Sequence, residues 1–237
     1  MKTLRLYGAG LLVALLLTLA ACLPGGISGS GIGETWTQRT STLLLRDNLA
    51  SVAYGKGLFV AVGWNGTILT TYGYSWTQRT SGTSNALYGV TYGNGLFVAV
   101  GARGTILTSS DGATWTARTS GTSNDLNGVA YGKGLFVAVG EDGTILTSPD
   151  GVSWTQRTSP VSERTSPVSK ILNGVTYGNG LFVAVGNLTT ILTSWDGKFW
   201  TLRAPPLGGH LLGVTYGDFK FVAVGGFPGI GTILTSP

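Results

Sequence analysis

The sequence is poor in charged residues and in the residues that build disulfides and metal sites. Its 237 residues include 15 Lys and Arg, 10 Asp and Glu, one His and one Cys. A single Cys excludes an internal disulfide. No His, Cys or Asp group has the spacing of metal ligands, and we expect neither a metal nor a cofactor. Since Lys and Arg form no cluster, we also expect no nucleic-acid partner.

Helical periodicity is missing beyond the first residues, whereas Gly and apolar residues are abundant. Gly occurs 39 times, and apolar residues make up 43% of the chain. This apolar content supplies a core and excludes a disordered chain. The frequent Gly-x-Gly pairs are interpreted as hairpin turns rather than as a loop that cradles phosphate. The chain is therefore predicted to be all-β.

The first 21 residues are typical of a bacterial secretory signal. A basic start, Met1–Arg5, precedes an apolar run, Leu11–Ala21, which is too short and too abruptly ended for a membrane-spanning helix. Leu19-Ala20-Ala21-Cys22 resembles the lipobox, in which the Cys sulfur receives a diacylglycerol. We therefore expect cleavage before Cys22, its lipidation, and a Gly- and Ser-rich tether over residues 22–33. This predicts a lipid-anchored protein of the bacterial cell envelope, on the periplasmic or surface side; the alternative is an ordinary signal with an incidental Cys.

Residues 34–237 repeat one unit five times. The heptapeptide Gly57–Gly63 returns at 95–101, 134–140 and 180–186, and in weaker form at 219–225. A second motif, Trp-Thr-x-Arg, recurs at intervals of 40, 39, 39 and 46 residues, with its Trp at Trp36, Trp76, Trp115, Trp154 and Trp200. Periods near 40 residues that are rich in Trp and Gly are typical of β-propellers.

Each unit is predicted to form four short strands. In one unit they are Leu126–Tyr131, Leu135–Val139, Thr144–Ser148 and Trp154–Arg157. The second strand has no polar alternation, which fits a strand that is buried on both faces. The chain opens with a lone fourth strand, Trp36–Arg39, and its last unit, Leu211–Ser236, lacks one. We therefore predict a five-bladed β-propeller of four-stranded blades over residues 34–237, whose last blade is closed by the N-terminal strand. The alternative is an open array that awaits further repeats.

The turns between third and fourth strands carry a Ser-x-Asp-Gly signature that ends in Trp. Its Asp and Trp residues are Asp111, Trp115, Asp150, Trp154, Asp196 and Trp200. The signature resembles the Asp-box of the sialidase-like β-propeller superfamily, which includes propellers similar to the photosystem II assembly factor. It is one residue shorter between Asp and Trp, and Thr71–Trp76 lacks the Asp. The resemblance implies that Asp accepts N–H bonds within the turn and that Trp packs between blades.

The catalytic residues of sialidases are not recognisable in this sequence. The repeated Arg residues lie one per blade on the outermost strand and cannot converge on one substrate: Arg39, Arg79, Arg118, Arg157 and Arg203. The repeated Tyr residues are interpreted as scaffold for the same reason: Tyr54, Tyr92, Tyr131, Tyr177 and Tyr216. We therefore expect no catalytic residues and no enzyme activity. The alternative is a sialidase-like glycoside hydrolase or lyase that acts at the channel mouth.

The repeats differ most in the turns between second and third strands and in the connections between blades. We predict a ligand-binding surface there, near the mouth of the central channel, formed by Trp64, Arg103, Glu141, Asp142 and His210. An aromatic face beside carboxylates suits a sugar or a peptide side chain. Adjacent carboxylates on one turn are poorly placed as an acid and base pair. His210, in the connection 204–210, is expected to be exposed to solvent.

The predicted function is that of a monomeric, lipid-anchored binding or scaffold module for an unidentified protein or glycan. An assembly factor of an envelope or membrane complex is a further alternative.

Overall fold

The computed structural model describes residues 48–161, 170–203 and 209–236. These residues form five antiparallel sheets, four with four strands and the last with three. The order of strands in every sheet follows the sequence, so neighbouring strands within a sheet are joined as hairpins. No helix in these three ranges is long and apolar enough to cross a membrane. The described chain is all-β and built from one repeated unit, as expected for a β-propeller.

The strands have the following bounds. The first sheet contains β1 (Leu49–Gly55), β2 (Leu58–Gly63), β3 (Ile68–Thr71) and β4 (Thr77–Arg79). The second contains β5 (Leu87–Gly93), β6 (Leu96–Gly101), β7 (Ile106–Ser109) and β8 (Thr116–Arg118). The third contains β9 (Leu126–Gly132), β10 (Leu135–Gly140), β11 (Ile145–Ser148) and β12 (Thr155–Gln156). The fourth contains β13 (Leu172–Gly178), β14 (Leu181–Gly186), β15 (Ile191–Ser194) and β16 (Thr201–Arg203). The fifth contains β17 (His210–Gly217), β18 (Lys220–Phe227) and β19 (Ile230–Ser236).

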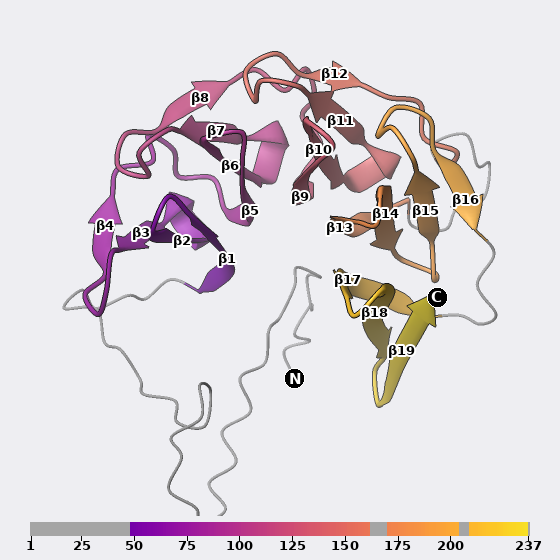
Figure 1. Cartoon of the computed structure of the whole chain (residues 1–237). Coiled ribbons are helices and arrows are strands. Elements are labelled where there is room, and N and C mark those ends of the chain that lie inside the picture. Colours follow the sequence, from indigo (N-terminus) through magenta and orange to yellow (C-terminus); the bar gives the residue numbers. More distant parts are fainter. Residues whose placement is uncertain (1–47, 162–169, 204–208, 237) are drawn as a thin grey trace, which may run out of the picture.

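The five sheets stand side by side in an arc, with the first strand of each sheet on the inner side (Figure 1). These inner strands, β1, β5, β9, β13 and β17, pack against one another in series. The fourth strands lie on the outer rim (Figure 1). Among the described residues the arc is open between the first sheet and the fifth (Figure 1). The predicted strand Trp36–Arg39, which would close the last blade, lies outside the described residues, as do the predicted signal segment and Cys22.

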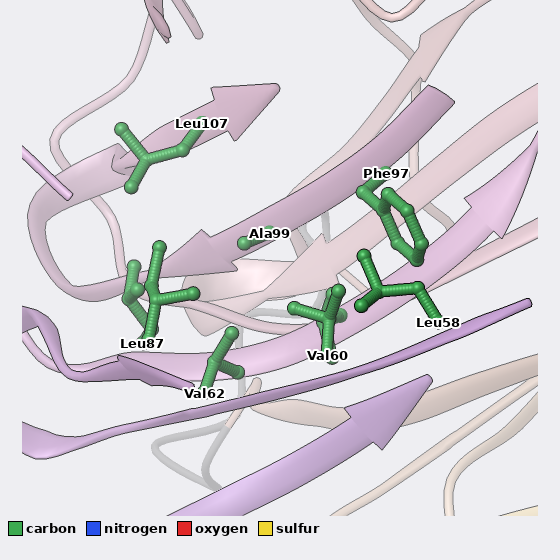
Figure 2. Packing of buried hydrophobic residues seen from close by; sticks show 9 residues of the cluster. Leu58, Val60, Val62, Leu87, Phe97, Ala99 and Leu107 are labelled. Atoms are coloured by element: carbon green, nitrogen blue, oxygen red, sulfur yellow. The ribbon is translucent and has the colours of Figure 1, made fainter. Parts of the chain in front are cut away.

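Successive sheets are held together by the apolar second strands. β2 presents Leu58, Val60 and Val62 to the second sheet. Figure 2 shows the side chains of the second sheet that pack against them: Leu87, Phe97, Ala99 and Leu107. Because side chains alternate along a strand, a fully apolar strand contributes to the cores on both of its faces. Phe136 and Phe182 fill the equivalent places at the next two junctions, and burial of each such Phe contributes about 1.5–3 kcal/mol.

The repeated Tyr residues join neighbouring sheets at the ends of the inner strands. Gly55 has no room for a Cβ atom because the ring of Tyr92, from the next sheet, lies over it. The same arrangement recurs at the next three junctions, under Tyr131, Tyr177 and Tyr216. Each Tyr ring also packs on the Phe of its own hairpin, with ring centroids 4.6–4.9 Å apart. These Tyr side chains are part of the scaffold.

Alternation of the hairpins gives the arc two faces. The β1–β2 hairpin and the β3–β4 turn of the first sheet, with their equivalents, lie on one face, which we call the turn face. The turns between second and third strands, and the connections between sheets, lie on the opposite face, the connection face. Two contacts across neighbouring sheets of the turn face agree with this grouping. Lys56 Nζ donates to the carbonyl of Ser110 at 3.3 Å, and Lys133 Nζ donates to that of Trp195 at 3.1 Å.

On the turn face, an Asp organises the β7–β8 turn of the second sheet. Asp111 Oδ1 accepts the N–H groups of Ala113 at 2.8 Å and Thr114 at 2.9 Å, and the hydroxyl of Ser109 at 2.9 Å. These bonds, above all the one from Thr114, lower the pKa of Asp111 to about 2. Trp115 Nε1 donates to the carbonyl of Gly112 at 3.0 Å.

The same turn is built in the third and fourth sheets. Asp150 and Asp196 each accept two backbone N–H groups in the same way. Trp154 and Trp200 each donate to the Gly of their own turn at 3.0 Å. All three Trp rings pack against the cores between sheets. The Asp and Trp side chains are therefore part of the turn architecture.

One local prediction was wrong. The fourth strands begin one residue after Trp76, Trp115, Trp154 and Trp200, because each Trp still belongs to the preceding turn. In the fifth sheet, the turn between the second and third strands is a tight hairpin in which Phe227 pairs with Ile230, with Gly229 in the left-handed region at φ 85°.

Candidate binding site

Four of the five predicted binding residues lie on equivalent short turns of the connection face. Trp64 begins η1 (Trp64–Gly66), Arg103 is in the middle of η2 (Ala102–Gly104), and Glu141 and Asp142 begin η3 (Glu141–Gly143). These turns belong to the first, second and third sheets. The sequence differences among three near-identical repeats are therefore displayed on one face of the molecule.

Arg103 occupies a backbone conformation that an Arg seldom adopts. Its φ of 56° lies in the left-handed region, where Asn, Asp and Gly are favoured. Asn65 and Asp142 take the equivalent position in the neighbouring turns, at φ 54° and 52°. The Arg103 N–H donates to Asp125 Oδ1 at 2.8 Å, a charge-assisted bond that stabilises the turn.

Asp125 links the Arg103 turn to the Glu141 turn. While its carboxylate accepts the Arg103 N–H, its backbone carbonyl accepts the N–H of Glu141 at 2.9 Å. The hydroxyl of Tyr88, from β5, donates to Asp125 Oδ2 at 3.4 Å. Sequence reasoning missed both Asp125 and Tyr88. A signal for Asp125 was present, because the two identical Ser-Gly-Thr-Ser-Asn connections are followed by Ala86 in one case and Asp125 in the other.

Carboxylates gather between the second and third sheets on this face. Burial raises the pKa of Glu141, and the charges of Asp125 and Asp142 raise it further. Burial and the charge of Asp125 likewise raise the pKa of the Tyr88 hydroxyl. Glu141 therefore holds a proton to higher pH than an ordinary Glu. Within the described part of the chain, no three His, Cys, Asp or Glu side chains are arranged to hold a metal ion.

A shallow groove of about 610 Å³ lies next to this cluster, between two connections of the connection face. Segments 82–83 and 119–123 contribute to its lining from these two connections. Its charged and hydroxyl-bearing lining includes Arg103, Arg118, Thr83, Thr105, Thr122 and Ser123. No Asp or Glu belongs to the described residues that line it. The groove therefore offers positive charge and hydroxyl groups, and its described lining contains no carboxylate.

Internal hydrogen bonds hold both connections in place. Ser120 Oγ donates to the carbonyl of Thr122 at 3.1 Å, and Thr122 Oγ1 accepts the N–H of Asn124 at 3.1 Å. Asn124 Nδ2 then donates to Thr144 Oγ1 of the next sheet at 2.9 Å. Ser81, Thr83 and Asn85 repeat these bonds in the other connection. Because the walls are preformed, a ligand would order few groups on binding.

The remaining predicted residues lie elsewhere on the arc. Trp64 belongs to the first sheet and is half-exposed. The prediction for His210 was wrong. This residue begins β17 and is half-buried, with its ring edge-on to Phe227 at a centroid distance of 5.5 Å. Its Nδ1 atom is buried and has no hydrogen-bond partner among the described residues. The structure therefore brings Arg103 and Glu141 together around Asp125, with Asp142 beside Glu141, and it places Trp64 and His210 on other sheets.

No protein-family model and no curated protein matches the chain, but solved propeller structures do. YCF48 bound to D1 peptide is similar at a TM-score of 0.62 and 21% identity, over 86% of this chain and 68% of that chain. YCF48 from Cyanidioschyzon merolae gives 0.58 and 19%, over 77% and 65%. A chain of the nidogen/laminin complex gives 0.59 and 12%, over 76% and 72%. At such identities the likeness shows the fold alone. This chain covers about two thirds of the length of the matched YCF48 chains.

Proposed function

We propose that this protein is a non-catalytic binding module of the cell envelope that takes an acidic segment of a partner protein into the groove of the connection face. The observation that carries the proposal is the groove itself, which combines Arg103, Arg118 and a row of hydroxyl groups and contains no carboxylate among its described lining residues. Arg guanidinium groups bind carboxylates with paired hydrogen bonds. The volume of about 610 Å³ lies in the range of sites that accept small ligands or a few residues of a peptide.

A solved relative in fold supports a peptide as the ligand. YCF48, whose structure is similar to this chain, has been solved bound to D1 peptide. A propeller of this shape therefore can hold a peptide. The adjoining carboxylates of Glu141 and Asp142 suit a basic residue elsewhere on the same segment, which would give the peptide a direction.

The proposal is tested with an array of extended peptides in which Asp and Glu alternate with other residues, matched by copies that carry Asn and Gln. We expect the acidic peptides to bind the full-length protein, and Arg103→Gln to weaken that binding. Loss of a hydrogen bond to a charged group costs about 1.5–3 kcal/mol, or about ten- to hundred-fold in Kd. Lys198→Gln is the matched control, because it removes the same charge from the turn face. Equal binding by both variants, or a preference for the Asn and Gln copies, would overturn the proposal.

We further propose that Cys22 carries the lipid that holds the protein on a membrane. The proposal rests on the signal-like start of the chain and on the position of its only Cys. Full-length protein is expected in the membrane fraction, and Cys22→Ser is expected to abolish the incorporation of labelled fatty acid and to move the protein to the soluble fraction or block its processing. Labelled fatty acid that still attaches to Cys22→Ser would exclude this site.

The last blade is proposed to be completed by Trp36–Arg39, which would pair with β19 and close the five blades into a ring. Two observations support this strand. The fifth sheet has three strands where the other four have four, and Trp36–Arg39 repeats the Trp-Thr-x-Arg motif that elsewhere leads into the fourth strand.

One observation favours a second candidate, a glycoside hydrolase at the channel mouth. Glu141 has a raised pKa next to Asp125 and Asp142, and a general acid needs such a shift. Turnover of a glycan that disappears in both Glu141→Gln and Asp142→Asn would establish this activity. If the acidic segment belongs to a subunit of a membrane complex, the protein would act as an assembly factor. Co-purification of that complex with the native chain but not with Arg103→Gln would identify this role.

A further inference from the structure

Aromatic side chains are exposed at the tips of the turn face. Five of them, with 64–85% of their surface exposed, are Tyr72, Tyr74, Trp195, Phe199 and Phe219. They come from the β3–β4 turn of the first sheet, the β15–β16 turn of the fourth and the β17–β18 hairpin of the fifth. The second and third sheets carry no aromatic residue at the equivalent positions of these turns, which are occupied by Ser110, Ala113 and Thr114 in the second sheet and by Pro149, Val152 and Ser153 in the third. The aromatic tips are thus confined to three sheets that become neighbours if the ring closes.

Phe219 shows that these aromatics are not an incidental result of the repeat. The other four hairpins have Gly at this position, at φ 74–79°: Gly57, Gly95, Gly134 and Gly180. Phe219 adopts the same left-handed region at φ 59° and is 85% exposed. A bulky residue is strained in that conformation, and its side chain gains no burial within the described fold in return.

Lysines accompany the aromatic tips. Of the five Lys residues in the described ranges, four lie on the turn face: Lys56, Lys133, Lys198 and Lys220. Lys220 stands where the other second strands begin with a Leu that packs into the junction. Its Nζ atom lies 3.1 Å from the exposed carboxylate of Asp218. On the first, fourth and fifth sheets, three lysines of this face are accompanied by two acids, Asp196 and Asp218.

We infer that this part of the turn face rests on a lipid surface. Exposed Trp, Tyr and Phe side chains partition into the boundary between headgroups and acyl chains, and Lys side chains extend past them to the lipid phosphates. Such contacts need protruding apolar tips rather than a groove, and the turn face presents its aromatics on separate turns. The groove lies on the connection face, which points in the direction opposite to the turn face.

The N-terminal part of the chain would bring a membrane close to this face. Because Cys22 is proposed to carry a lipid, a membrane is within reach of the domain, and this inference rests on that anchorage for the presence of the membrane. Trp36 aligns with Trp115, which ends a turn of the turn face and leads into β8. If the residues after Trp36 form the proposed fourth strand, the tether from Cys22 would enter that strand from the turn face, and the connection face would point away from the bilayer toward a partner.

The test asks which face touches lipid in the anchored, full-length protein. The protein is reconstituted into vesicles of phosphatidylethanolamine and phosphatidylglycerol with brominated acyl chains, which quench Trp fluorescence on contact. Trp195→Phe is expected to lose most of the quenching that depends on bromine. Trp64→Phe, on the connection face, is expected to retain it. Quenching that survives Trp195→Phe, or that disappears in Trp64→Phe, would overturn the inference.

A pair of gain-of-signal variants guards against an effect of Trp195→Phe on folding. Phe219→Trp adds an indole at the turn face and should increase the quenched fraction, whereas Leu188→Trp adds one at the connection face and should not. The opposite ranking would also contradict the inference. The apolar run Leu11–Ala21, if retained, holds the chain on vesicles as well. Failure of this test is therefore separate from failure of lipidation, which the fatty-acid incorporation into Cys22 measures.

Discussion

The junctions between sheets and the two ends of the arc contain the same side chains in different surroundings. Phe97 is 0% exposed at a junction, whereas its equivalent Phe59, on the side of the first sheet that faces away from the second, is 46% exposed. At the other end Ile233 is 72% exposed, and its equivalent Ile68 is 0% exposed. The burial of these residues therefore comes from the neighbouring sheet. Each sheet of this repeat is complete only with a partner on both sides, as in other repeat proteins.

The two ends are also complementary to each other. Tyr54 is exposed at the start of the arc, where its equivalents cover a Gly of the preceding sheet. Gly217, at the end of the arc, has nothing within 4 Å of the place where a Cβ would stand. The first sheet thus presents the aromatic ring of Tyr54, and the fifth sheet presents Gly217, on which such a ring packs at the other junctions. Large exposed apolar surfaces of this kind are usually contact sites. This complementarity supports the proposed closure of the ring.

The largest difference between a junction and an end of the arc is expected when a Phe is replaced by Ala at each place. Phe136→Ala is expected to lower the free energy of unfolding by about 3–5 kcal/mol, as for other buried Phe residues. If the ring closes in the full-length protein, Phe59→Ala should cost a similar amount. Urea unfolding measures both. A loss with Phe59→Ala below half of that with Phe136→Ala would show that the first sheet keeps a free face.

Deletion of Glu34–Ser41 tests the strand that is proposed to join the ends. The fourth strands are three residues long or shorter in the described sheets, and their few hydrogen bonds contribute about 0.5–1.5 kcal/mol each. We expect a total loss of about 2–3 kcal/mol by urea unfolding. The free edge of β19 should also produce dimers in analytical ultracentrifugation. A product that is equally stable and monomeric would refute the closure.

Asp111→Asn tests the Asp-containing turn, which the first sheet replaces with a turn that has no Asp. The pKa of Asp111 is lowered to about 2, so its carboxylate stabilises the fold above about pH 4, and this contribution is lost as the pH falls toward 2. The variant should unfold at lower urea than the native chain at neutral pH, and the difference should shrink on acidification. The first sheet carries Tyr72 and Gly73 in the equivalent turn and has no Asp there, so Tyr72→Asn serves as a control without such pH dependence. A difference that is constant with pH would contradict the role of the charge.

Glu141→Gln is expected to change the stability least, and to raise it at neutral pH where the other variants lower it. Burial and neighbouring carboxylates raise the pKa of Glu141, so the charged form destabilises the fold once the pH rises through that raised pKa. The variant should therefore melt at a slightly higher temperature than the native chain at neutral pH and at the same temperature in acid. Scanning calorimetry at both pH values measures this, and a variant that is less stable at neutral pH would contradict it.

The sequence predicted the repeated strands well because each carries its own local signals. An apolar run such as Leu135–Val139 is suited to a place between two other layers, and the Gly-Lys-Gly sequence before it marks a hairpin. The sequence predicted this turn at Gly132–Lys133, and the structure has it one residue later, at Lys133–Gly134, because Gly132 still pairs with Leu135. These signals lie within one unit and need no knowledge of its neighbours.

The site was predicted only in part, because its contacts join different units. The turns that carry Arg103 and Glu141 were identified by their variation, but Asp125 joins them across a sheet boundary, and Tyr88 reaches the same carboxylate from β5. His210 was misplaced because the strand β17 starts earlier than the repeat suggests. The groove likewise depends on the distance between two connections, which a repeat pattern does not contain.

The two faces of the molecule are proposed to have different partners, with a partner protein bound on the connection face and a membrane under the turn face. The most direct measurement places the photo-crosslinking residue benzoyl-phenylalanine in the membrane-bound protein, at Ser123 in the groove or at Phe199 on the turn face. We predict that the residue at position 123 crosslinks to a protein and that the residue at position 199 crosslinks to lipid. Lipid at position 123 together with protein at position 199 would contradict the account.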